Sequence, residues 1–200
     1  MPARTVLQQA DITRALTRIS HEILESNRGA HDLVVLGIPT RGVILAERIG
    51  ALLTQISGSP VPTGALDVTL YRDDLARNPT RAPSPTQVPS DGIDGMTVVL
   101  VDDVLYSGRT IRAALDALGA IGRPRIVRFA TLIDRGHREL PIRPDFVGKN
   151  LPSSQNERIN VHLIESDGDE FVTIEEVASP VDTGPLDTGP VDTGAAEAKA

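Results

Sequence analysis

One stretch near the middle of the chain constrains the fold more than any other part of the sequence. Residues 97–101 are Thr-Val-Val-Leu-Val, a run typical of a strand that is buried on both faces. Two adjacent carboxylates, Asp102 and Asp103, follow the run, and a turn over residues 102–108 leads into a helix expected over residues 109–119. A strand that passes through a short turn into a helix predicts a layered α/β fold.

The same alternation of strand and helix patterns continues on both sides of this stretch. Apolar runs predict strands, and apolar residues at helical spacing predict helices. We expect strands over residues 33–38, 64–71, 125–133, 159–164 and 170–174, and helices over 43–56 and over 11–28, with Asp11 as its N-cap. Irregular segments are expected over 72–95 and 135–152. This order predicts a mostly parallel central sheet with flanking helices, and ligands in the loops that begin at Pro39, Asp102 and Asp134.

Composition limits the class of protein. The chain has 200 residues, 40% of them hydrophobic and only 2% aromatic, so aliphatic side chains must build the core of one domain. It has no cysteine, which excludes disulfides, thiolate catalysis and zinc–thiolate sites. The first residues do not follow the pattern of a secretory signal, and no apolar run has the roughly 20 residues that span a bilayer. We therefore expect a cytoplasmic protein with no membrane partner.

The last residues differ from the rest of the chain. A five-residue unit, Pro-Val-Asp-Thr-Gly or Pro-Leu-Asp-Thr-Gly, occurs three times from Pro180 onward. Such low complexity, with little apolar surface, is typical of disorder. We expect one folded domain over residues 1–177 and a disordered low-complexity tail over 178–200.

The turn after the central strand has the chemistry of a phosphate site. Backbone N–H groups at a helix N-terminus bind anions, Ser107 and Thr110 can add hydroxyl donors, and Gly108 permits close approach of the backbone. Asp102 and Asp103 stand just upstream, where they can accept hydrogen bonds from a diol. A capped helix after a core strand is the plain alternative, but a cap needs only one acidic residue or hydroxyl. The combination predicts a site for a ribose 5-phosphate.

The stretch from Val98 to Thr110 resembles the signature of type I phosphoribosyltransferases, which binds phosphoribosyl pyrophosphate (PRPP). The resemblance implies that Asp102 and Asp103 are catalytic, hold the ribose hydroxyls and bind Mg²⁺ that arrives with PRPP. It implies a PRPP and nucleotide site formed by Asp102, Asp103, Val104, Leu105, Tyr106, Ser107, Gly108, Arg109 and Thr110. Tyr106 stands where purine-using relatives often have an acidic residue, which argues against a purine substrate.

Two other segments fit the same resemblance. Pro39-Thr40-Arg41-Gly42 matches the family's pyrophosphate loop, with Thr40 and Arg41 as ligands and Arg41 as a catalytic cation. We expect a strained non-proline peptide bond near Thr40, for which the cis form is one option. Tyr71 and Arg72 match the start of a mobile loop that closes over PRPP, and Arg72, Arg77 or Arg81 could reach the pyrophosphate from it.

Residues 134–150 resemble the corresponding stretch of a narrower group, the pyrimidine-operon regulators that are also uracil phosphoribosyltransferases. The resemblance runs from about residue 7 to residue 175, with departures at Pro144 and Ser153-Ser154. It implies the type I phosphoribosyltransferase fold with a small hood over the base. It also implies a uracil pocket formed by Arg135, Phe146, Val147 and Gly148, with selectivity carried largely by backbone groups.

The resemblance further implies regulation through RNA. In that group, a basic surface binds a hairpin in the leader mRNA of the pyrimidine operon and responds to UMP or UTP. The matching residues are Thr17, Arg18, His21, His137, Arg138, Arg143 and Lys149. Most charged helix faces are merely solvated, and for Arg14 and Arg28 a solvated face explains the charge as well as RNA binding does. Because the net charge is −7, RNA binding would have to be local, and a homodimer or higher homo-oligomer is expected to present it.

Three functions therefore remain in order of preference. The first is a bifunctional regulator that binds leader mRNA and makes UMP from uracil and PRPP. The second is a uracil salvage enzyme, a pentosyl-transferring glycosyltransferase with no RNA role. The third is a purine phosphoribosyltransferase, against which Tyr106 and residues 134–150 argue. RNA affinity that depends on nucleotide separates the first from the second, and base specificity separates both from the third.

Overall fold

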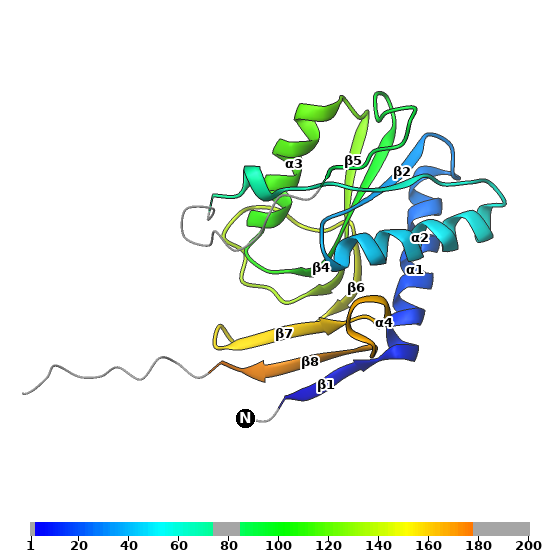
Figure 1. Cartoon of the computed structure of the whole chain (residues 1–200). Coiled ribbons are helices and arrows are strands. Elements are labelled where there is room, and N and C mark those ends of the chain that lie inside the picture. Colours follow the sequence, from blue (N-terminus) through cyan, green and yellow to red (C-terminus); the bar gives the residue numbers. More distant parts are fainter. Residues whose placement is uncertain (1–2, 74–84, 178–200) are drawn as a thin grey trace, which may run out of the picture.

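Short aliphatic runs build a parallel central sheet (Figure 1). The structure, a computed structural model, describes residues 3–73 and 85–177. The expected tail over 178–200 and the loop arginines Arg77 and Arg81 lie outside those residues. The sheet has the order β3-β2-β4-β5-β6, and every neighbouring pair is parallel. Its strands are β2 (Leu33–Gly37), β3 (Thr63–Ala65), β4 (Thr97–Leu105), β5 (Ile126–Asp134) and β6 (Phe146–Asn150).

Helices cover both faces of this sheet, as the continuous apolar strands predict. On one face α1 (Gln9–Asn27) and α2 (Arg41–Ser57) pack in a core that takes Val99 and Val101 from β4. On the other face α3 (Arg109–Ile121) packs in a second core that takes Val98 and Leu100 from the same strand. Successive side chains of a strand point to opposite faces, so β4 supplies both cores.

A small antiparallel sheet forms the expected hood. Its order is β1-β8-β7, with β1 (Arg4–Gln8), β7 (Glu157–His162) and β8 (Phe171–Glu176). The short helix α4 (Ile164–Asp167) connects β7 to β8. In Figure 1 this hood lies below the central sheet, on the side where β4 ends. Val161 and Val172 anchor the hood in the same core as α1 and α2.

Several expected boundaries were wrong. The strand expected over 64–71 is only β3, followed by a single 3₁₀ turn, Thr69–Tyr71. The turn expected from Asp102 begins later, because β4 continues to Leu105 in parallel register with β5. The irregular segment 135–152 contains β6, and β1 and α4 were not anticipated. Gln8, not Asp11, is the N-cap of α1, and the Asp11 carboxylate accepts a hydrogen bond from the Gln8 backbone N–H at 3.0 Å.

The described part of the chain has no helix with both the length and the apolar character needed to cross a membrane.

Candidate functional site

The last residues of β4 carry the two carboxylates of the signature. Asp102 is only 8% exposed, and its Oδ1 accepts a hydrogen bond from the Asp103 backbone N–H at 3.0 Å. Asp103 is half-buried, and its Oδ1 accepts from the Val104 N–H at 2.9 Å. Asp103 also lines the cleft between the central sheet and the hood. Because both residues still belong to the strand, the sheet fixes their backbone positions.

Burial changes the acidity of the first carboxylate. Desolvation raises the pKa of Asp102 well above its usual value, and the neighbouring charge of Asp103 raises it further. The nearby Arg72 guanidinium opposes this shift only in part. Asp102 therefore retains a proton to higher pH than an ordinary aspartate. A diol or a cation that enters the site would favour the ionised form of this carboxylate.

The loop after β4 is hydrogen-bonded to a segment that lies later in the chain. The Ser107 carbonyl accepts hydrogen bonds from the Glu139 N–H at 2.9 Å and the Leu140 N–H at 3.1 Å. Gly108, at φ 94°, turns the chain into α3, a conformation that favours glycine. The loop thus presents the helix N-terminus beside the two carboxylates, as a phosphate site requires.

The Arg109 side chain has other partners. Its Nε donates to Glu139 Oε2 at 2.7 Å, and its Nη1 pairs with Asp73 Oδ2 at 2.5 Å. The Arg109 guanidinium is therefore engaged by two carboxylates in this conformation. These ion pairs also connect the expected mobile loop, at Asp73, with the signature.

The expected pyrophosphate loop has a cis peptide bond between Pro39 and Thr40, which confirms the unusual peptide expected there. Gly42 follows at the start of α2 and is buried. A Cβ atom at Gly42 would lie 2.5 Å from the Val101 carbonyl oxygen of β4. The glycine therefore allows this loop to pack directly against the strand that carries Asp102.

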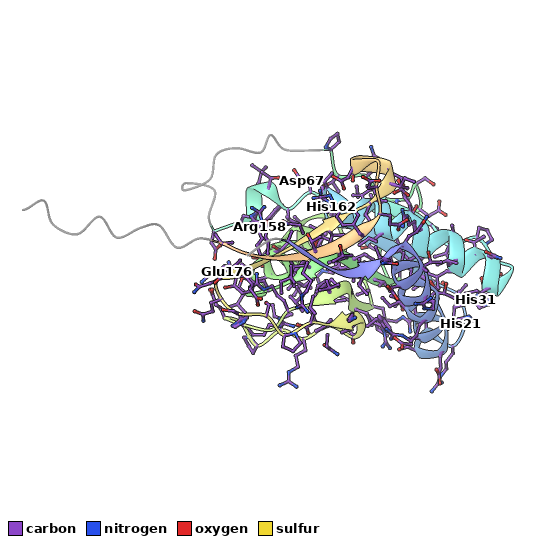
Figure 2. The ribbon with its side chains drawn as sticks, turned by 90° about the horizontal axis from the view of Figure 1, so that it is seen from below. His21, His31, Asp67, Arg158, His162 and Glu176 are labelled. Atoms are coloured by element: carbon purple, nitrogen blue, oxygen red, sulfur yellow. The ribbon has the colours of Figure 1, made fainter. Side chains whose placement is uncertain are left out.

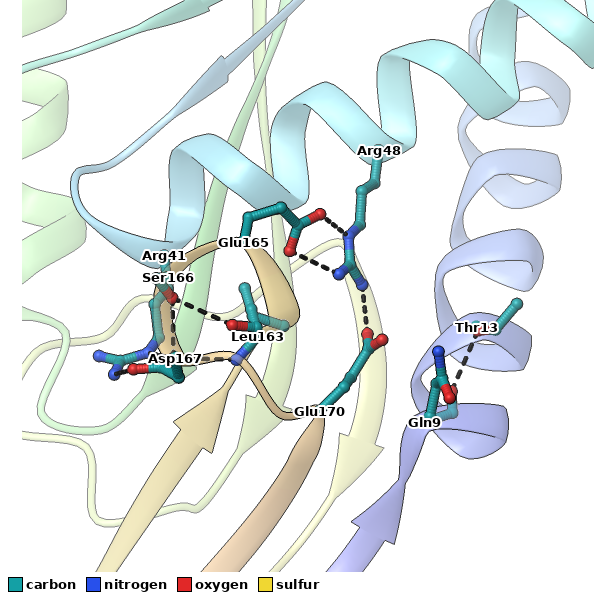
Figure 3. A network of polar contacts seen from close by, with 9 residues as sticks. All are labelled: Gln9, Thr13, Arg41, Arg48, Leu163, Glu165, Ser166, Asp167 and Glu170. Carbon is teal, nitrogen blue, oxygen red and sulfur yellow. Dashed lines mark hydrogen bonds and ion pairs between the residues drawn. The ribbon is translucent and has the colours of Figure 1, made fainter.

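Arg41 does not point freely into the cleft. Its Nη2 donates to Asp167 Oδ1 at 2.9 Å and its Nε to Oδ2 at 3.3 Å, as Figure 3 shows. Asp167 belongs to α4 of the hood, and it also accepts from the Leu163 N–H and the Ser166 hydroxyl. These hydrogen bonds lower the pKa of Asp167 to about 2, and the bond from the Leu163 N–H has the largest effect. The expected pyrophosphate ligand is thus paired with the hood.

The start of the expected mobile loop lies against the signature. Arg72 Nη1 donates to Thr110 Oγ1 at 3.4 Å, and Tyr71 is 38% exposed. The structure therefore brings Arg72 close to both Thr110 and Asp102. The proposed roles of Arg77 and Arg81 fall on residues that the structure does not describe.

The expected uracil residues divide into two groups. Phe146, Val147 and Gly148 are successive residues of β6, the strand that lies beside β5 at the sheet edge. Arg135 is 8% exposed and lies 4.3 Å above the Tyr106 ring. It donates to Ser153 Oγ at 2.9 Å and to the carbonyls of Ser154 and Glu157 at 2.9 and 2.7 Å. Arg135 therefore joins the loop before β7 to the signature, and a contact with the base stays a prediction.

A cleft of about 600 Å³ lies between the end of the central sheet and the hood. Arg41, Asp103 and Val104 line it on one side. Polar hood residues that were not expected at the site line the other side: Arg158, Asn160, His162, Thr173 and Glu175. Figure 2 shows Arg158 and His162 on the hood strands, away from His21 and His31. Strand alternation through residues 158–162 was the available signal, because these polar positions alternate with the buried Ile159 and Val161.

The expected RNA residues gather around β6 and the loop before it. Arg138, Arg143 and Val147 line one shallow cavity of about 420 Å³. Arg18 reaches Val147 from α1, and Lys149 Nζ donates to the Val6 carbonyl at 3.4 Å. Thr17 and His137 instead bond to nearby backbone carbonyls, those of Thr13 and Ser153. His21 lies apart, in a larger cavity of about 810 Å³ that it shares with Arg28 and His31.

The described residues include no cluster of three or more His, Cys, Asp or Glu side chains arranged to hold a metal ion. Asp102 and Asp103 nevertheless offer carboxylate oxygens near the end of β4, and Asp103 lines the cleft. A hard cation such as Mg²⁺ commonly binds through one or two carboxylates together with substrate phosphates. The donor set therefore fits an ion that is shared with a bound diphosphate.

Comparison with known proteins agrees with this geometry. A family model described as phosphoribosyl transferase domain matches residues 3–163. A protein from Leifsonia xyli subsp. xyli named Bifunctional protein PyrR is 69% identical over 181 residues, covering 88% of this chain and 98% of its own. The chain belongs to the PyrR family of phosphoribosyltransferases. A second PyrR protein, from Streptomyces coelicolor, is 62% identical and covers 86% of this chain and 89% of its own.

Solved structures support the fold of this PyrR family member. A hypoxanthine-guanine phosphoribosyltransferase from Bacillus anthracis aligns with a TM-score of 0.63 and 18% identity, covering 85% of this chain and 96% of that chain. A hypoxanthine phosphoribosyltransferase from Trypanosoma cruzi aligns with a TM-score of 0.65 and 14% identity, covering 87% and 97%. These identities establish the type I phosphoribosyltransferase fold and no more.

Proposed function

We propose that this PyrR family member makes UMP and diphosphate from uracil and PRPP, and that it regulates pyrimidine-synthesis genes by binding leader mRNA in response to UMP or UTP. The single observation that carries the enzymatic part is the end of β4. There Asp102 and Asp103 precede Gly108 and the N-terminus of α3, so a diol site stands beside an anion site. A ribose 5-phosphate fits that pair of sites.

The proposed reaction is a substitution at C1 of the ribose. The bond from C1 to the diphosphate oxygen breaks, the bond from C1 to uracil N1 forms, and the N1 proton passes to the departing diphosphate or to water. The transition state has oxocarbenium character by analogy with glycoside chemistry. The protein contributes chiefly by holding both reactants in place and by stabilising the departing diphosphate.

Each side chain of the proposed site has a distinct part in the reaction. Asp102 and Asp103 accept hydrogen bonds from the ribose hydroxyls, and the α3 N-terminus binds the 5′-phosphate. Arg41 releases Asp167 and binds the diphosphate. Arg72, which contacts Thr110 at the start of α3, also approaches the bound PRPP. Mg²⁺ bound with PRPP would supply charge neutralisation of the diphosphate, with Asp102 and Asp103 as its protein ligands.

The base site is proposed at β6. Backbone N–H and C=O groups of Phe146, Val147 and Gly148 would form hydrogen bonds with the pyrimidine. Arg135, stacked on the Tyr106 ring, would form one side of the base pocket. Tyr106 carries no carboxylate for a purine ring nitrogen. We therefore propose uracil as the acceptor base and hypoxanthine as a poor one.

The enzymatic proposal is tested by incubating the protein with PRPP, Mg²⁺ and either uracil or hypoxanthine, and separating the nucleotides by chromatography. UMP formation that Asp102→Asn abolishes while the thermal unfolding transition persists would support it. IMP formation in place of UMP would replace it with a purine transferase.

The RNA proposal concerns the residues around β6 together with α1. Arg18, Arg138, Arg143 and Lys149 present positive charge there, and phosphate contacts of this kind are salt-sensitive. We propose that a homodimer or higher homo-oligomer joins two such surfaces. Filter binding of leader mRNA with and without UMP, at two salt concentrations, tests this. Affinity that UMP strengthens supports a regulator, and activity without RNA affinity would indicate a salvage enzyme alone.

A further inference from the structure

Arg18 joins helix α1 to the strand proposed to read the base. Its Nη2 donates to the Val147 carbonyl at 2.9 Å and to the Gly148 carbonyl at 2.7 Å. Its Nη1 donates to Glu22 Oε1 at 2.8 Å, one turn along α1. A guanidinium is a fixed cation with several donors in a rigid fork, so it can hold two carbonyls and a carboxylate at once.

The strand β6 depends on this contact because of its place in the sheet. It lies at the edge of the sheet, with β5 as its one neighbour among the strands of residues 3–73 and 85–177. On the β5 side the packing is close, since a Cβ atom at Gly148 would lie 2.4 Å from the Leu132 carbonyl oxygen. From α1, Arg18 donates to the carbonyls of Val147 and Gly148. The backbone of these two residues is therefore clamped between β5 and α1.

We propose that Arg18 is a positioning residue for the pyrimidine base, acting through the backbone of Val147 and Gly148. The inference rests on the proposed uracil site and assigns to Arg18 a role beyond a contact with RNA phosphate. Recognition by backbone groups depends on their positions to a fraction of an ångström, because a displaced backbone cannot adjust as a flexible side chain can. Loss of the clamp weakens binding of the base and leaves binding of the ribose 5-phosphate unchanged.

The same contact explains how a nucleotide can influence RNA. The Arg18 side chain is 50% exposed, so one face of it is open to a partner while the other holds β6. A base that binds against Val147 and Gly148 acts on the same carbonyls that Arg18 holds. Coupling between two ligands is reciprocal, so RNA that engages Arg18 changes base affinity by the same factor as the base changes RNA affinity.

The test compares UMP with ribose 5-phosphate by isothermal titration calorimetry. In Arg18→Gln we expect the Kd of UMP to rise by about fivefold or more, and the Kd of ribose 5-phosphate to stay within about twofold. Arg18→Lys, which keeps a cation at this position, is expected to recover part of the UMP affinity. Arg14→Gln is the matched control, since Arg14 lies one turn earlier on α1 and pairs only locally with Asp11.

The outcomes separate this inference from the proposed function. Equal UMP affinity in Arg18→Gln and the unaltered protein would overturn the positioning role, and so would an equal loss of UMP and ribose 5-phosphate affinity. If the unaltered protein binds ribose 5-phosphate but not UMP, the uracil site and the inference both fail. If UMP binding responds as expected but leader mRNA does not bind, the positioning role stands and the RNA proposal fails.

Discussion

Arg41 of the pyrophosphate loop and Asp167 of the hood form a two-point ion pair, at 2.9 and 3.3 Å, which joins the central domain to the hood. The neighbouring Arg48 of α2 holds the same hood helix through Glu165, and it holds Glu170 just before β8 (Figure 3). A diphosphate that binds the Nε and Nη2 edge of Arg41 must displace Asp167. The hood is therefore connected to the occupancy of the pyrophosphate loop.

Removing the carboxylate should favour the substrate. We expect Asp167→Asn to lower the KM for PRPP by up to about fivefold, because a partly exposed ion pair contributes up to about 1 kcal/mol and its loss frees Arg41. Steady-state kinetics with PRPP as the varied substrate checks this. Glu165→Gln is the control. Glu165 lies on α4 like Asp167, but its carboxylate pairs with Arg48 and not with Arg41. A raised KM in Asp167→Asn would show that Asp167 orients Arg41 for the substrate.

Asp102 should oppose stability at neutral pH. Because burial and Asp103 raise its pKa in the folded state, the folded protein holds a proton that the unfolded chain has released. Stability is therefore lost as the pH rises from the unfolded value of about 4 toward the raised folded value. Asp102→Asn removes this loss, and we expect its melting temperature to equal or exceed that of the unaltered protein at pH 8, by more than at pH 5.

The same substitution should nearly abolish turnover. We expect kcat to fall by about 100-fold or more, as for other groups that stabilise a transition state directly. Thermal unfolding and UMP formation are measured on the same preparations. A variant that melts earlier at pH 8 would contradict the stability argument, and one that retains full activity would contradict the catalytic role.

Gly42 should tolerate no side chain. A Cβ atom there would meet the Val101 carbonyl oxygen at 2.5 Å, so Gly42→Ala must displace the pyrophosphate loop from β4. We expect a loss of about 1–3 kcal/mol in the free energy of unfolding, and a raised KM for PRPP. Gly119→Ala in α3 is the control, because a Cβ atom at Gly119 meets nothing within 4 Å. That substitution should be neutral or stabilising, by up to about 1 kcal/mol. Chemical denaturation decides between these results.

Arg138 should affect the nucleotide site as well as RNA. Its Nη1 donates to the Tyr106 carbonyl at 2.8 Å, and its Nη2 pairs with Asp134 at 2.5 Å. We expect Arg138→Ala to raise the KM for PRPP by about threefold to tenfold, because a charged hydrogen bond to the phosphate loop is lost. Arg125→Ala removes a comparable bond, to the Gly95 carbonyl at the other end of the sheet, and should leave the KM unchanged. An unchanged KM in Arg138→Ala would show that Arg138 does not support the nucleotide site, and would leave only its proposed role in RNA binding.

The features that strong local patterns encode were predictable from the sequence. Continuous aliphatic runs predicted β2, β4 and β5, and the Asp102–Thr110 signature predicted the residues at the end of β4. The cis peptide bond at Thr40 confirmed an expectation drawn from resemblance. The whole-chain α/β fold followed from the alternation of these elements.

The elements that tertiary contacts stabilise were not predictable in the same way. β6 contains Gly148 and Lys149, and it forms because it pairs with β5 and is held by Arg18 from α1. β1 is an edge strand of the hood that exists through its pairing with β8. The partners of Arg41 and Arg135 are distant in the chain, so their ion pairs and hydrogen bonds could not be read from spacing.

Both borders of the central sheet are partly covered by other parts of the chain. At one border β3 has only three residues, and Ala65 exchanges two backbone hydrogen bonds with Gln87 at 2.9 and 2.8 Å. At the other border Arg18 occupies carbonyls of β6. An open strand edge invites another chain to pair with it. Copies of this protein that associate are therefore expected to meet through side-chain surfaces and not by continuing the central sheet from one subunit into the next.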